Sequence, residues 1–143
     1  MTHEDDLRTQ AAGDYPEEAA AEMLIRGFHG QFAAPGNPWI ERGTNGRPWI
    51  NFRSIPEHID RYSGGEQKFL MLAASLGDAA PVELGEILPG MDRHMLDLVL
   101  AAFAHAAGSH EHSSVLQNPD GTASFTRLPP LYPWPPEHRH WPD

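Results

Sequence analysis

The stretch from Arg61 to Leu76 constrains the fold most, because it specifies both the start and the buried face of a helix. Ser63 and Glu66 have the spacing of a capping box, in which each side chain accepts a hydrogen bond from the other residue's backbone N–H. Apolar residues follow at helical spacing: Phe69, Leu70, Leu72, Ala73 and Leu76. Gly77 is typical of a helix end. We therefore predict a buried helix over residues 64–76.

Two further helices are predicted by the same criteria. Asp14 precedes a proline and two glutamates, which favours a helix over residues 16–28. Asp92 and Gly108 bracket an apolar-periodic segment, which indicates a helix over 92–107. Small residues on the helices at 64–76 and 92–107 would allow close approach, so we expect these two to form the central pair. Short helices are expected near residues 55–62 and 83–88.

Two hairpins complete the predicted fold. Pro38-Trp39-Ile40 and Pro48-Trp49-Ile50 flank an Asn-Gly turn, which is typical of a β-hairpin. A second pair of strand-like segments flanks Pro119-Asp-Gly121. The expected fold is a small, mainly helical α+β domain with one or two short antiparallel hairpins.

Composition divides the chain into three parts. Residues 1–13 are polar and acidic, and we predict that they are disordered. Residues 14–128 form the single globular domain. Residues 129–143 contain six prolines, which favours an extended tail. Four large side chains make this tail a candidate partner-binding segment, docked either on the domain or on another protein: Leu131, Tyr132, Trp134 and Trp141.

Composition also limits the classes of function. The formal net charge is −10, which argues against sequence-independent binding of nucleic acid and fits solubility or a protein partner with a basic surface. The chain has no cysteine, which excludes disulfides and thiolate chemistry. No apolar run approaches the roughly 18 residues of a membrane span, and the acidic start is unlike a signal peptide. We expect a cytoplasmic protein, and the residue usage suggests a GC-rich bacterium or a phage.

Three groups of residues are candidate sites. The helix start at Ser63, Gly64 and Gly65, with Arg61 and Lys68 nearby, has free N–H groups that could bind an anion. Trp39 and Trp49 could stack on a ligand or form a small aromatic core, and we favour the core. His105, His110 and His112 could bind a metal ion, or could respond to pH instead.

Ser63-Gly-Gly-Glu-Gln67 followed by an apolar helix resembles the signature motif of ABC-type ATPases, and the resemblance extends over residues 62–107. In that family the serine and glycine contact the γ-phosphate of ATP. Val82-Glu-Leu-Gly-Glu-Ile87 takes the place of a Walker B strand, but Gly85 precedes Glu86 where an Asp-Glu pair is expected. The chain also has no GxxxxGK[ST] phosphate loop. We interpret the resemblance as convergence on a good helix start.

The sequence leaves two classes of function open. No catalytic motif such as GxSxG or HExxH occurs, so we favour a non-enzymatic protein-interaction or regulatory protein without a cofactor, associated with a phage or mobile element. Its partner would be another protein, and a homodimer is an open alternative. The second hypothesis is an anion- or phosphate-binding module, or a remnant enzyme, that uses the Ser-Gly-Gly helix start.

Overall fold

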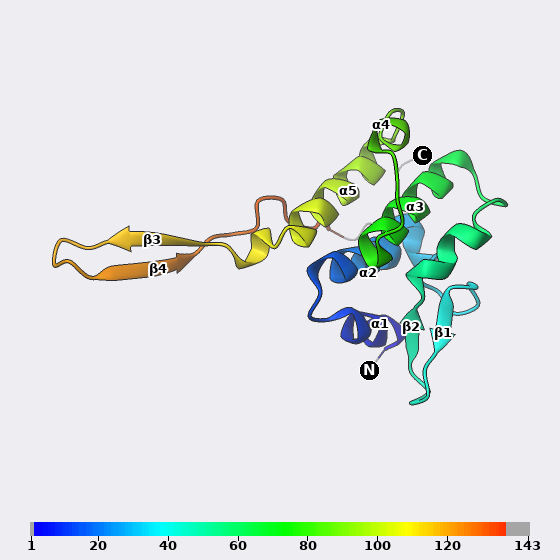
Figure 1. Ribbon diagram of the computed structural model, residues 1–143, viewed down its shortest axis with the longest axis horizontal. Helices are drawn as coiled ribbons and strands as arrows, with labels where there is room; N and C mark the ends of the chain where they lie inside the picture. Colours follow the sequence, from blue (N-terminus) through cyan, green and yellow to red (C-terminus); the bar gives the residue numbers. More distant parts are fainter. Residues whose placement is uncertain (1, 137–143) are drawn as a thin grey trace.

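Helix α2 (Tyr15–Arg26) lies at the centre of the protein in this computed structural model, which describes residues 2–136 (Figure 1). Its buried residues cover more than half of its circumference: Ala19, Ala20, Ala21, Met23, Leu24 and Ile25. A helix that is apolar over so much of its surface must be covered on several sides. Helices α3 (Gly64–Asp78) and α5 (Arg93–Ala106) both pack against it.

The prediction that the helices at 64–76 and 92–107 form the central pair is wrong. The extensive contacts of α3 and α5 are with α2 and not with each other. Three consecutive alanines, Ala19–Ala21, are fully buried in α2 and allow both neighbours to approach closely.

Helix α1 (His3–Ala11) corrects the prediction of a disordered N-terminus for residues 1–13. Thr2 and Asp5 form a capping box, so the helix start is satisfied locally. Leu7 and Ala11 are buried against the body, which supplies the tertiary contact that a helix of this length needs.

Glu22 of α2 links α1 to the central helix. Its carboxylate accepts hydrogen bonds from Arg8 Nε at 2.5 Å and from Arg26 Nε at 2.6 Å. Burial raises the pKa of Glu22, but the two guanidinium groups lower that pKa by more, so the net shift is downward. The carboxylate is therefore charged at neutral pH and joins the two helices.

The strands form two separate two-stranded antiparallel sheets, which confirms the predicted α+β class. One pairs β1 (Ile40–Arg42) with β2 (Pro48–Ile50). The other pairs β3 (Ser113–Gln117) with β4 (Ala123–Arg127). The remaining elements are short: η1 (Gly27–Gly30), η2 (Phe52–His58), α4 (Leu84–Ile87) and η3 (Ser109–Glu111).

An aromatic cluster fills the core beside α2 and α3. Trp39 is completely buried, and its indole N–H donates to the Phe32 carbonyl at 2.7 Å. Phe32 packs edge-on against Tyr62 and Phe28, and Phe28 packs against Phe69. The aromatic core expected from the sequence therefore includes Trp39.

The β3–β4 hairpin extends away from the helical body as an arm (Figure 1). The chain leaves α5 through η3, runs out along β3 and returns along β4. Residues 128–136 then lead back to the body without regular secondary structure, and Trp134 packs against the core. The molecule thus consists of a helical body and a two-stranded arm, defined here as residues 113–127.

Gly77 lies inside α3 and does not end it, because the helix continues to Asp78 and Ala79 adopts the left-handed capping conformation. The glycine is needed for packing. A Cβ at this position would lie 2.2 Å from Cγ of Phe52 and clash with its ring. The absence of a side chain lets η2 pack directly on α3.

We predict that Gly77→Ala lowers the free energy of unfolding by about 1–3 kcal/mol, because the new methyl group must displace the buried Phe52 ring. The matched control is Gly65→Ala in the same helix, where the nearest atom to a new Cβ is 3.9 Å away. This control should be neutral or stabilising, since alanine favours a helix more than glycine does. Urea denaturation of both variants tests the prediction, and equal effects would contradict it.

Candidate functional site

The arm is closed by a well-defined turn. Gly121 N–H donates to the Asn118 carbonyl at 3.0 Å, and Gly121 has the positive φ of 88° that this turn requires. The Asp120 carboxylate accepts from both the backbone N–H and the hydroxyl of Thr122. Local chemistry therefore fixes the register of the hairpin, which pairs Val115 with Phe125.

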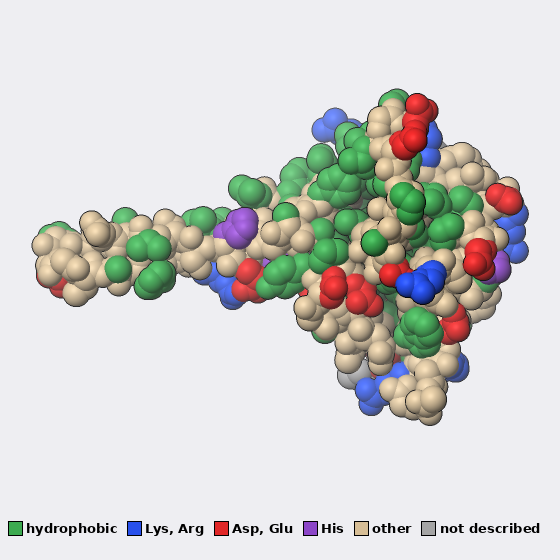
Figure 2. Space-filling model, in the orientation of Figure 1, with side chains coloured by type: hydrophobic (Ala, Val, Ile, Leu, Met, Phe, Trp, Pro, Cys, Tyr) green, Lys and Arg blue, Asp and Glu red, His purple; other side chains and the backbone are tan. Residues whose placement is uncertain are grey.

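Large apolar side chains of the arm are open to solvent. The exposed fractions are 58% for Val115, 59% for Leu116 and 76% for Phe125. Val115 and Phe125 lie opposite each other on one face, and Leu116 lies on the other face. Figure 2 shows hydrophobic side chains distributed along the arm. Neither face is the covered, apolar side that a stable sheet normally has.

The backbone of the arm also presents unpaired edges. At the two ends of the ladder, Asn118 N–H donates to Thr122 O and Leu128 N–H donates to His112 O. Hydrogen-bonded pairs alternate along an antiparallel ladder, so the pairs at 114–126 and 116–124 also bond inward. The N–H and C=O groups of Val115 and Phe125 therefore point outward from the two edges. Each edge can accept another strand.

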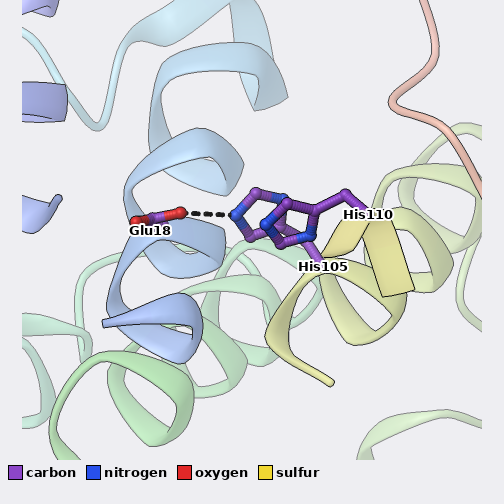
Figure 3. A group of neighbouring side chains, drawn as sticks. All are labelled: Glu18, His105 and His110. Atoms are coloured by element: carbon purple, nitrogen blue, oxygen red, sulfur yellow. Dashed lines mark hydrogen bonds and ion pairs between the residues drawn. The ribbon is translucent and has the colours of Figure 1, made fainter. Parts of the chain in front are cut away.

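Three side chains meet where the arm joins the body, and we call them the root cluster: Glu18, His105 and His110 (Figure 3). Helices α2 and α5 run in opposite directions, so the first turn of α2 meets the last turn of α5. His105 Nε2 lies 2.8 Å from Glu18 Oε1. Because a carboxylate only accepts, the proton of this hydrogen bond belongs to the histidine when Glu18 is charged.

His110 stacks on His105 with ring centroids 4.0 Å apart and an angle of 8° between the rings. Tyr15 packs edge-on against both imidazoles. Nδ1 of His110 is buried and has no hydrogen-bond partner among the described residues. Buried polar atoms are rarely left in this state, so the cluster has an unused ligand atom.

Glu18 is held in place by two donors. Gly13 N–H donates to Oε2 at 2.8 Å, and His105 donates to Oε1. Burial raises the pKa of Glu18, whereas the hydrogen bonds from Gly13 and His105 lower it, and the net pKa is below the ordinary value. Glu18 is therefore a carboxylate at neutral pH, with one oxygen turned towards the two imidazoles.

The sequence predicted a metal site at His105, His110 and His112, and the structure brings the first two together. His112 is exposed at the start of the arm and is not part of the cluster found in residues 2–136. The sequence-based prediction missed Glu18, which lies 87 positions from His105. No local signal connects them, because their contact depends on how α2 and α5 pack. Metal binding at this cluster remains a prediction.

Several side chains of the candidate anion site contact other groups of the same chain. Ser63 and Glu66 form the predicted capping box, and the Glu66 carboxylate lies at the positive end of α3. Arg61 lies over the Tyr62 ring, and Lys68 Nζ donates to the Pro89 carbonyl. Gly64 and Gly65 are exposed. Anion binding here stays a prediction.

The candidate stacking residues are separated in the structure. Trp39 is fully buried, which leaves it no open face for a ligand. Trp49 is half-buried and lies opposite Glu41 in the hairpin register, so the two tryptophans do not pair across the strands.

The tail contacts the body at residues that were candidates for partner binding. Arg26 lies over the Trp134 ring and donates to the Pro135 carbonyl at 3.1 Å. The Tyr132 hydroxyl group donates a hydrogen bond to the Asp97 carboxylate. Leu131 is 82% exposed. Trp141 lies outside the described residues.

The comparisons with known proteins give no relative for this chain: no protein-family model, curated protein or solved structure matches it. The likeness to the ABC-type signature motif accordingly has no support beyond its residues. Within residues 2–136, no helix combines the length and apolar character needed to cross a bilayer.

We predict that Trp134→Ala lowers the free energy of unfolding by about 1–3 kcal/mol, because it removes a half-buried ring that contacts Arg26 and His105. Leu131→Ala is the matched control and should leave stability unchanged, since its side chain is exposed. Thermal unfolding followed by circular dichroism compares the two. Similar losses from both substitutions would mean that the tail is not docked through Trp134.

Proposed function

We propose that this chain is a non-enzymatic interaction protein whose β3–β4 arm binds another protein. The observation that carries the proposal is an isolated two-stranded sheet with exposed apolar side chains and open edges. Two-stranded hairpins are marginally stable in water and gain stability when a third strand or a packing surface covers them. A partner that adds a strand to the arm would supply both.

The composition of the arm supports this role. Between Ser113 and Thr126 the only charged residue is Asp120, which lies in the turn, although the whole chain has a net charge of −10. Monomeric proteins usually protect exposed edges with charged residues, prolines or bulges in the strands. The strands of this arm up to Thr126 have none of these residues, so their edges are open to pairing with another chain.

Charge favours a different protein over a second copy. Two chains with a net charge of −10 repel each other, whereas a partner with a basic surface is attracted over a range set by the ionic strength. The proposed partner therefore has a free strand edge with apolar side chains and a basic surface nearby. Self-association through two arms is the competing outcome.

The test has two stages. Proteins that co-purify stoichiometrically with the tagged chain from its native host are first identified by mass spectrometry. The purified partner is then titrated calorimetrically with the wild-type chain and with the double variant Val115→Ala/Phe125→Ala. Central apolar side chains usually dominate binding energy, so we expect the double variant to bind at least about tenfold more weakly. Both side chains are exposed, so the body should keep its stability.

Leu100→Ala is the matched control, because Leu100 is an exposed leucine on α5 of the body, 42% accessible. Its affinity should stay within about twofold of the wild type. Equal affinity of the double variant and the wild type would exclude the arm as the binding element. Light scattering that shows a dimer abolished by the double variant would assign the arm to self-association instead.

A further inference from the structure

We propose that the root cluster binds a divalent transition-metal ion, with Zn²⁺ as the preferred ion, and that the ion ties the root of the arm to helices α2 and α5. The ligands are one carboxylate oxygen of Glu18 and one imidazole nitrogen each from His105 and His110. All three ligand atoms lie within 4.8 Å of one another. This proposal does not depend on the proposed partner of the arm.

The donor set selects the class of ion. Two imidazoles and one carboxylate form a mixed nitrogen and oxygen set of the kind that zinc takes in proteins, with a fourth position open to water. Calcium and magnesium prefer sets made only of oxygen atoms. The chain has no cysteine, so soft thiolate sites are excluded.

The buried, unpartnered Nδ1 of His110 is an independent indication of a ligand. Leaving such an atom without a partner costs free energy, and coordination of a metal ion through Nδ1 would remove that cost. The proton between His105 Nε2 and Glu18 Oε1 lies where a metal could replace it. Metals bind neutral imidazoles and carboxylates, so binding would displace this proton.

Coordination requires one local change. The ligand atoms of a tetrahedral zinc ion lie about 3.3 Å apart, and the ion lies in the plane of each imidazole ring that coordinates it. The two rings are stacked within 8° of parallel, so a single ion cannot lie in both planes. One imidazole must rotate, and His110 is the better candidate because it lies in the short 3-10 helix η3. Metal binding would thus end the stacking of the two rings.

The surroundings suit a metal ligand set. Gly13 N–H occupies Oε2 of Glu18, which leaves Oε1 to coordinate. Such contacts behind the ligands orient them and increase metal affinity. Tyr15 lies against both histidines, and Trp134 lies 5.9 Å from the His105 ring. These rings would shield the ion on the sides that they cover.

Metal binding would restrict the movement of the arm relative to the body. Glu18 comes from α2, His105 from the last turn of α5, and His110 from η3 directly before β3. A bound ion would connect all three elements and reduce the freedom of the arm relative to the body.

The experiment uses the full chain purified without a polyhistidine tag and titrated with Zn²⁺ by calorimetry and with Co²⁺ by visible absorption. We expect one ion per chain and the strong absorption of low-symmetry, four-coordinate Co²⁺. His110→Ala and Glu18→Gln should each weaken binding at least about tenfold. His112→Ala is the matched control, since this exposed histidine lies two positions away, and it should change affinity less than about twofold.

A readout on the wild-type chain keeps the test independent of variant folding. Histidine side-chain NMR should show zinc-induced shifts for His105 and His110 but not for His112. An unchanged zinc affinity of the His110→Ala variant would overturn the proposal. It would mean that other histidines of the chain bind the ion. The proposal would also be overturned by weak binding with several ions per chain, or by an effect of His112→Ala as large as that of His110→Ala.

Discussion

Burial of α2 on most of its surface is the interaction on which the other elements depend. Ala19, Ala20 and Ala21 are small enough for helices to approach from more than one direction, and Met23, Leu24 and Ile25 supply buried apolar area one turn further along the helix. Helices α1, α3 and α5 therefore gain stability from one shared helix. Glu22 adds charged hydrogen bonds to Arg8 of α1 and Arg26 of α2, which orient α1 without exposing the apolar surface.

The same packing determines where the arm begins. Because α5 runs opposite to α2, its last turn meets the first turn of α2, and His105 reaches Glu18 there. The chain then turns at Gly108, whose positive φ of 81° ends the helix beside the Tyr15 ring. The arm that follows has neither a covered face nor a paired outer edge among the described residues. A closed body and an open arm suit the proposed role of binding another protein.

Local features of the fold could be predicted from the sequence, because their causes are local. Asp14, Ser63 and Asp92 each cap one of the three helices predicted from the sequence, and Pro119-Asp-Gly121 forms the turn of the second hairpin. These elements depend on hydrogen bonds within a few residues.

Features that depend on tertiary contact could not be predicted in this way. Gly77 has the usual appearance of a helix end, but its role is to admit the Phe52 ring. The acidic segment 1–13 has the composition of a disordered tail, but burial of Leu7 and Ala11 stabilises a helix there. Glu18 joins the root cluster only because α2 and α5 pack against each other. The carboxylate of the candidate metal site could not be predicted for that reason.

Amide hydrogen exchange of the isolated chain, resolved by mass spectrometry or NMR, tests the central claim most directly. If the body around α2 is stable and the arm is uncovered in the isolated chain, the slowest amide exchange is expected in Ala19–Ile25. Fast exchange is expected at the outward-facing amides of Val115 and Phe125, since these amides lie on open edges of the arm. Protection of those two amides as strong as that of α2 in a monomeric sample would contradict the account. It would mean that the chain itself already covers the arm.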